Sequence, residues 1–93
     1  MKEKNLERLL THEVRKMGGL ALKFVSPGMA GVPDRLLLFP GGKLAFCEVK
    51  APGEKPRQLQ VHRMEQLRKM GFKVFVIDGS EQIGGMIDEI CSS

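Results

Sequence analysis

Two carboxylates and an amine stand in otherwise apolar segments of this sequence. Asp34 follows Gly31-Val32-Pro33 at the start of an apolar run, and Glu48 and Lys50 end the run of residues 44–50. Strands usually exclude charged side chains from their buried positions. The three residues therefore indicate a chemical site.

A hairpin is predicted to bring these residues together. Residues 34–39 and 44–50 are strand-like, and Pro40-Gly41-Gly42 between them is typical of a tight turn. Antiparallel pairing places the start of the first strand beside the end of the second. Alternate side chains of a strand share a face, so Glu48 and Lys50 lie together and Asp34 lies near them.

Two converging carboxylates repel each other unless a cation lies between them, and hard oxygen ligands suit Mg²⁺ or Mn²⁺. A lysine beside such an ion can hold an attacking water, which makes a phosphodiester-hydrolysing site. Glu48-Val49-Lys50 taken alone fits a surface ion pair better. The apolar flanks and the hairpin favour the site.

The second predicted helix, residues 57–70, places Gln60 within its apolar stripe. The stripe consists of Leu59, Met64, Leu67 and Met70. A glutamine on this inward face needs hydrogen-bond partners, such as Lys50, a water or a phosphate. A buried amide with a purely structural role is an equally good interpretation.

The first predicted helix, with apolar residues from Leu6 to Met17, offers a further carboxylate in Glu3, Glu7 or Glu13. Glu3 and Glu13 fall within its apolar arc and Glu7 falls on the margin. The periodicity does not choose among them, and glutamates near the start of a helix also simply complement its dipole.

Composition predicts one small domain covering residues 1–93. The net charge of +4 with 15 Lys and Arg favours an anionic partner. Because no long apolar run or signal-like segment is present, we expect a soluble, intracellular protein without membrane contact. Cys47 and Cys91 suggest no disulfide, and His12 and His62 lack the spacing of a metal pair.

The predicted order of elements is α-β-β-β-α-β-α, an α/β fold with a mixed sheet of about four strands flanked by helices. The remaining strands are expected at residues 20–25 and 72–77. A weak last helix, interrupted by Gly84-Gly85, is expected at the end of the chain.

Gly31-Val32-Pro33-Asp34-Arg35, Glu48-Val49-Lys50 and Gln60, in that order, resemble the VRR-NUC domain of the PD-(D/E)XK nuclease superfamily. The stretch from Gly18 to Gly28 is also similar to stand-alone phage and bacterial members. The resemblance implies a restriction-endonuclease-like core. In it, Asp34, Glu48 and the Val49 carbonyl hold Mg²⁺ or Mn²⁺, and Lys50 orients the hydrolytic water. Gln60 occupies the glutamine position of the family.

Archaeal Holliday-junction resolvases, which are similar in layout, carry a glutamate in the first helix. Their spacing selects Glu7 as a metal ligand, with Glu3 as the fallback. The same resemblance implies Ser26 near the scissile phosphate and Lys23 and Arg35 as DNA contacts. It also implies a homodimer that acts on branched DNA.

The sequence thus predicts a Mg²⁺- or Mn²⁺-dependent DNA endonuclease, acting on structures such as four-way junctions. Two alternatives stay open, a non-catalytic nucleic-acid-binding module that keeps the nuclease fold and a small α/β interaction domain. The preferred DNA structure, the number of metal ions and the dimer surface are not determined by the sequence.

Overall fold

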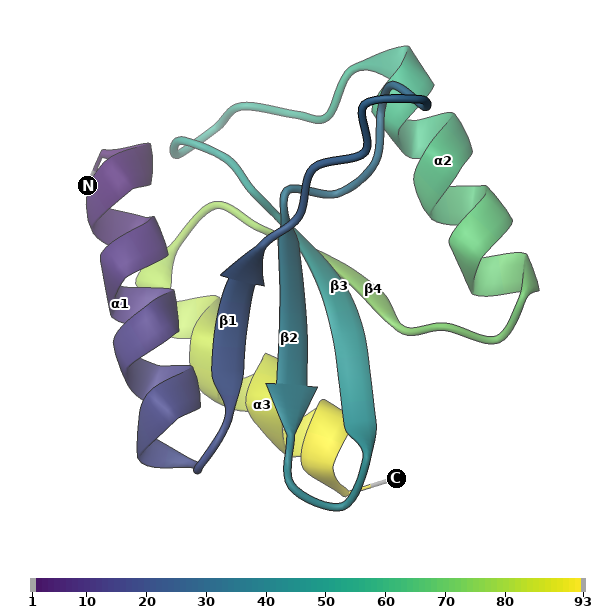
Figure 1. Ribbon diagram of the computed structural model, residues 1–93. Helices are drawn as coiled ribbons and strands as arrows, with labels where there is room; N and C mark the ends of the chain where they lie inside the picture. The colour runs from purple at the N-terminus through teal and green to yellow at the C-terminus, as the bar shows by residue number, and fades with distance from the viewer. Residues whose placement is uncertain (1, 93) are drawn as a thin grey trace.

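The computed structural model describes residues 2–92, and its elements follow the predicted order (Figure 1). The chain forms α1 (Glu3–Lys16), β1 (Leu20–Lys23), β2 (Arg35–Phe39), β3 (Lys43–Val49), α2 (Gln58–Lys69), β4 (Val74–Ile77), a short 3-10 helix (Ser80–Gln82) and α3 (Ile83–Cys91).

The four strands form one mixed sheet in the order β1-β2-β3-β4. The first three are antiparallel, and β4 pairs parallel to β3. Gly41 and Gly42 both have positive φ, at 86° and 74°, and they close the turn between β2 and β3. Arg35 pairs with Cys47, so the start of β2 lies beside the end of β3.

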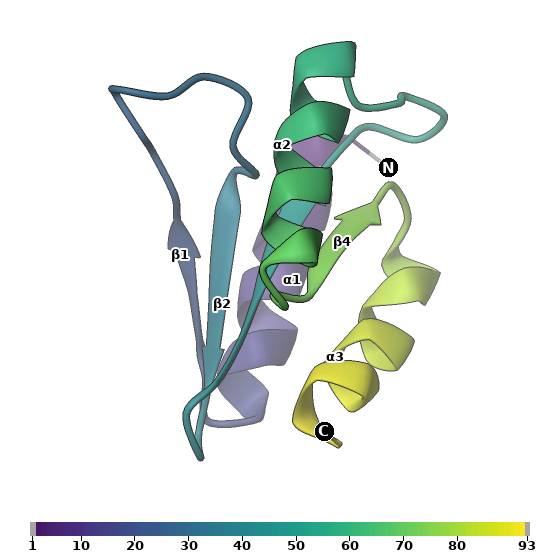
Figure 2. The same cartoon turned by 90° about the vertical axis from the view of Figure 1, so that its right-hand side faces the viewer.

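Helices α1 and α3 cover one face of the sheet (Figure 2). Leu6, Leu10 and Val14 recur at helical spacing and are fully buried. They pack with alternate residues of the strands, including Leu37 and Ala45. Cys47 is buried in the same core, and burial raises the pKa of its thiol far above the usual value. The core therefore holds the β2–β3 hairpin through the sheet face that packs on α1 and α3.

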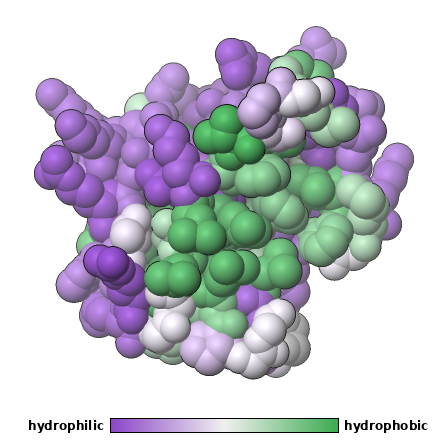
Figure 3. All heavy atoms as spheres, viewed as in Figure 1, coloured by the Kyte–Doolittle hydropathy of each residue, from purple (hydrophilic) through white to green (hydrophobic). Residues whose placement is uncertain are grey.

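The opposite face of β1 and β2 is apolar, and no helix of the described residues covers it, as Figures 1 and 2 together show. Helix α2 flanks β3, across a groove that Phe46 lines. The paired residues Leu20 and Leu38, then Leu22 and Leu36, share this face. Figure 3 shows apolar side chains gathered over these strands. We call this surface the open sheet face; its side chains are Leu20, Leu22, Leu36, Leu38, Leu44 and Phe46.

The predicted interruption of the last helix was wrong. Gly84 and Gly85 lie within a continuous α3, where both are solvent exposed. Four apolar side chains anchor the opposite side of the helix in the core, namely Ile83, Met86, Ile87 and Ile90. This burial outweighs the low helix propensity of glycine.

The predicted apolar stripe of α2 was only partly right. Gln60 and Met64 are buried, but Leu59 and Met70 are 46% and 65% exposed. The reason is that no further layer packs over the open sheet face, so the flank of α2 beside this face stays exposed. Within residues 2–92, no helix is both long and apolar enough to cross a membrane.

Candidate active site

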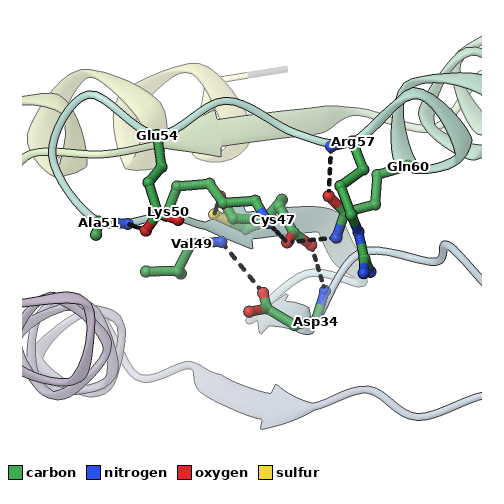
Figure 4. A network of polar contacts seen from close by, with 9 residues as sticks. Asp34, Cys47, Val49, Lys50, Ala51, Glu54, Arg57 and Gln60 are labelled. Atoms are coloured by element: carbon green, nitrogen blue, oxygen red, sulfur yellow. Dashed lines mark hydrogen bonds and ion pairs between the residues drawn. The ribbon is translucent and has the colours of Figure 1, made fainter.

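Asp34 and Glu48 meet where β2 begins and β3 ends, as expected from the predicted hairpin. Figure 4 shows Asp34 beside Val49 at this end of the sheet. The Asp34 backbone N–H donates to Oε1 of Glu48 at 3.1 Å. In return, the Val49 N–H donates to Oδ1 of Asp34 at 3.2 Å. Each carboxylate therefore holds the backbone of the other strand, which fixes both side chains at one end of the sheet.

Glu48 is buried, with 3% of its surface exposed. Its Oε2 contacts Nζ of Lys50 at 3.1 Å and accepts a hydrogen bond from Nε2 of Gln60 at 2.9 Å. A buried carboxylate requires such compensation because it has lost its hydration. The burial argues against a surface ion pair, and the contacts bring Asp34, Glu48, Lys50 and Gln60 together.

The orientation of the Gln60 amide is fixed by a contact that the sequence did not reveal. The Arg57 N–H donates to Oε1 of Gln60 at 2.8 Å, across the first turn of α2. The amide oxygen must accept this bond, so the amide nitrogen is left to donate to Glu48. A glutamine three residues after the N-cap is a recognisable signal for this back-bonding.

The surroundings of Asp34 disfavour its negative charge. Burial, followed by the charge of Glu48, raises the pKa of Asp34 from 3.8 to about 6. The charge of Glu7 acts in the same direction, whereas the Val49 N–H and Arg35 partly oppose it. An ionised Asp34 beside ionised Glu48 would be stabilised by a cation.

The backbone carbonyl of Val49 also fits a cation site. Extending the register of β2 and β3 by two residues, from Arg35 and Cys47, places Pro33 opposite Val49. Proline has no N–H, so this position supplies no donor to the Val49 carbonyl. The Val49 N–H is bonded by Asp34 instead. The prolyl residue before Asp34 thus leaves a carbonyl oxygen available.

These donors suit a divalent ion such as Mg²⁺ or Mn²⁺, which takes carboxylate and carbonyl oxygens and keeps several waters. Among residues 2–92, no three His, Cys, Asp or Glu side chains are grouped to hold a metal. Asp34, Glu48 and the Val49 carbonyl could supply two carboxylates and a carbonyl oxygen to such an ion.

Glu7 lies on the α1 side of Asp34, but its carboxylate pairs with Arg35, at 3.4 Å from Nη2. Glu13 pairs instead with Lys16 at 3.2 Å. Glu3 opens α1 and lies in its first turn. Of the three glutamates, Glu7 is the one whose charge acts on Asp34. It makes no contact with the residues around Glu48 in the network described above.

The predicted DNA contacts lie outside this network. Lys23 is exposed at the end of β1 and faces Arg35 across the β1–β2 pair. Ser26 lines an apolar groove of about 520 Å³ between the sheet and α2. Arg63 lines the same groove and donates to the carbonyl of Ala30 at 2.8 Å, a contact that the sequence did not predict.

Comparison with known proteins places this geometry in a family. A phage protein described as "Putative nuclease p44", from Acyrthosiphon pisum secondary endosymbiont phage 1, is 49% identical over 81 residues, 87% of each chain. A solved structure described as a VRR_NUC domain superposes with a TM-score of 0.88, at 32% identity over 95% of this chain and 96% of that one. The chain belongs to the VRR-NUC family. No protein-family model matches the chain.

Membership confirms the restriction-endonuclease-like fold expected from the sequence, with a four-stranded mixed sheet flanked by helices. In this VRR-NUC domain the family motifs fall on adjacent elements. The loop before β2 carries Asp34, the end of β3 carries Glu48, and the first turn of α2 carries Gln60.

Proposed function

We propose that this VRR-NUC protein is a Mg²⁺- or Mn²⁺-dependent DNA endonuclease. The observation that carries the proposal is the buried Glu48 carboxylate, which is held by Lys50 and Gln60 and linked to Asp34 through the Asp34 N–H. A structural role alone does not require two carboxylates at one sheet end, where the charge of Glu48 disfavours the ionised form of Asp34.

Asp34, Glu48 and the Val49 carbonyl would hold the metal. When bound, the metal neutralises phosphate charge and lowers the pKa of water, which is the chemistry that phosphodiester hydrolysis requires. The protein itself supplies the remaining positioning. Asp34 and Glu48 are preorganised by their bonds to the opposite strands, so little rearrangement opposes binding.

Lys50 is the residue placed to orient the attacking water. Its ammonium group has three N–H donors, and its side chain, which contacts Glu48, is 15% exposed. The remaining donors can bind a water and a phosphate oxygen. Gln60 positions Glu48 by donating to it, and the Arg57 N–H holds Gln60 in that orientation.

Binding to DNA would depend on phosphate contacts by Lys and Arg, given the net charge of +4. The chain has 5 Phe and no Trp or Tyr, so base stacking is a weak source of affinity. We expect binding that falls steeply with salt and depends little on sequence.

We further propose that the enzyme is a homodimer acting on branched DNA, with the open sheet face as the contact between copies. Leu20 and Leu22 are 51% and 43% exposed on this face. In a two-fold dimer, the open sheet face of one copy packs against the same face of the other copy. The alternative, apolar residues left in water on a small domain, is costly. Two symmetric sites would then suit opposing strands of a branched duplex.

The direct test is cleavage of a panel of labelled DNAs, comprising a four-way junction, a flap, a nicked duplex, a linear duplex and a single strand. We expect strand cuts in Mg²⁺ or Mn²⁺ and none in EDTA, with the branched forms cut fastest. Binding without cleavage in either metal would favour a non-catalytic binding module and would refute the enzymatic proposal. Equal cleavage of every form would refute selectivity for branches.

A further inference from the structure

A second cavity lies beside the candidate active site, on the α1 side of Asp34. It has a volume of about 300 Å³. Its lining comes from one face of α1 and from the first residue of β2, and comprises Lys4, Glu7, Arg8, Thr11 and Arg35. We call it the α1 pocket. None of these residues contacts Glu48 in the network described above.

The α1 pocket is positively charged. Lys4, Arg8 and Arg35 contribute three cations, and Glu7 contributes one carboxylate, which pairs with Arg35. The Thr11 hydroxyl donates to the Glu7 carbonyl and so supports the turn of α1 that lines the pocket. Lys4 and Arg8 are one helical turn apart and are both exposed, so their charges can reach a ligand.

Arg35 supplies the observation that points to a ligand. Its Nε is buried and, among residues 2–92, has no hydrogen-bond partner, although Nη2 contacts Glu7. A buried guanidinium N–H without an acceptor is unfavourable. An arginine carries only donors, so an acceptor for this N–H has to be an oxygen atom brought by a water or a ligand.

We propose that the α1 pocket binds a backbone phosphate of the DNA, next to the phosphate that is cut. Arg35 directly follows Asp34 at the start of β2, and the charges of Glu7 and Arg35 both act on Asp34, so the pocket lies within electrostatic reach of the hydrolytic site. A phosphate supplies acceptor oxygens to the guanidinium of Arg35 and charge complementarity to Lys4 and Arg8. This inference rests on the proposed DNA-cleaving function and adds a positioning site to it.

Such a site would set the register of the strand. A phosphate held in the α1 pocket fixes the neighbouring phosphate relative to Asp34 and Glu48, as backbone contacts in general position DNA without reading its sequence. The pocket would thus contribute to where the cut falls as well as to affinity.

The test is a binding titration in EDTA, by fluorescence anisotropy at several salt concentrations, with Lys4→Gln/Arg8→Gln and with wild-type protein. Loss of one phosphate contact lowers the slope of log affinity against log salt by about 1. The matched control is Arg15→Gln/Lys16→Gln, which removes two exposed charges from the same helix outside the pocket. We expect a smaller slope for the pocket variant than for the control.

A second measurement locates the contact on the DNA. Neutral methylphosphonates are placed singly at each position around the cut site. Wild-type affinity should fall several-fold at one flanking position, and the pocket variant should lose nothing further there. Arg35→Lys keeps the charge but removes Nε, and it should show a reduced effect at the same position, with folding checked by circular dichroism.

A pocket variant that matches the control in slope, or an equal loss at the flanking position in wild type and variant, would overturn the proposed phosphate site. The outcome is separable from that of the proposed catalysis. Pocket-dependent binding without any cleavage would leave the phosphate site standing and refute the endonuclease. Cleavage together with pocket-independent binding would support the endonuclease and refute the phosphate site.

Discussion

At the scale of single residues, the proposed site depends on how one buried carboxylate is compensated. Glu48 receives the Asp34 N–H on one oxygen and both Lys50 and Gln60 on the other. Asp34 has the Val49 N–H but no cationic side chain in contact among the described residues. The cost of the metal-free site is therefore concentrated on Asp34, whose pKa is raised to about 6.

Replacing Asp34 by asparagine should stabilise the metal-free protein near neutral pH. A raised pKa means that the folded state binds the proton more tightly than the unfolded state, whose pKa is near 3.8. Asp34 therefore destabilises the fold increasingly as pH rises from about 4 to about 6. Because the group is partly exposed, the expected gain for Asp34→Asn above this window is discounted to about 1 kcal/mol.

Urea unfolding of both proteins in EDTA, at about pH 4 and about pH 7, measures this difference. An asparagine oxygen can still accept from Val49, so the comparison isolates the charge. A stability difference between the two proteins that is the same at both pH values would contradict the assignment. In Mg²⁺ the same variant should lose cleavage.

The sequence predicted which of these residues come together better than it predicted their contacts. Asp34, Glu48 and Lys50 were predictable because a Gly-Gly hairpin with period-two alternation leaves few alternatives for their placement. The bond from the Arg57 N–H to Gln60 was missed, although a glutamine three residues after the N-cap is a signal for it. The pairing of Glu7 with Arg35 has no such signal, since it depends on how α1 crosses β2.

At the scale of elements, the loop before β2 packs against the start of α2 just before it reaches Asp34. Gly31 has a positive φ of 86°, and a Cβ there would lie 2.8 Å from Cγ of Leu59 and 3.0 Å from its carbonyl oxygen. Arg63 fastens the same loop through the Ala30 carbonyl. The close approach of this loop to α2 thus requires a residue without a side chain.

Gly31→Ala should therefore destabilise the protein and impair cleavage. Adopting a positive φ costs alanine about 1–2 kcal/mol, and the contact with Leu59 adds to this cost. Gly53→Ala is the matched control because Gly53 has a φ of 82° but nothing within 4 Å of its Cβ position. Thermal unfolding and cleavage rates measure the two effects. Equal losses in both variants would show that close approach to α2 is unimportant.

Helices and strands were predictable where the local sequence pattern matches the burial seen in the structure. They were less predictable where tertiary packing determines the structure. The period of α1 and the turn between β2 and β3 carry strong local signals. In α3, the glycine pair suggested a break, yet Ile83 and Ile90 anchor both ends of the helix in the core. The exposed flank of α2 was missed because its pattern alone does not show that the sheet face beside it is open.

At the scale of the whole molecule, the most prominent surface is the open sheet face. It is apolar over three strands, while the chain as a whole carries a net charge of +4. Contact between copies through this face would bury apolar area and leave the α1 pocket, on the other side of the sheet, available for DNA. The sequence predicted a dimer through the family resemblance alone. The open sheet face could not be predicted, because it depends on α1 and α3 both packing on the opposite face of the sheet.

Leu22→Glu should shift the protein to monomers. In a two-fold interface the substitution occurs twice, and each carboxylate would be buried against an apolar surface. We expect a dissociation constant raised by at least about 10-fold, equivalent to about 1.4 kcal/mol, in sedimentation equilibrium. Val61→Glu is the control, since Val61 is similarly exposed at 38% but lies on α2. An unchanged dimer, or a monomeric wild type, would refute this interface.

The most direct test of the central claim is the rate of DNA cleavage by Lys50→Ala in saturating Mn²⁺, beside wild type and Lys55→Ala, which alters an exposed loop lysine outside the site. We predict that Lys50→Ala lowers the cleavage rate by about 10²-fold or more. Its DNA binding in EDTA should fall only a few-fold, and Lys55→Ala should cleave at close to the wild-type rate. Cleavage by Lys50→Ala at the wild-type rate would contradict the claim that the amine beside Glu48 is part of a hydrolytic site.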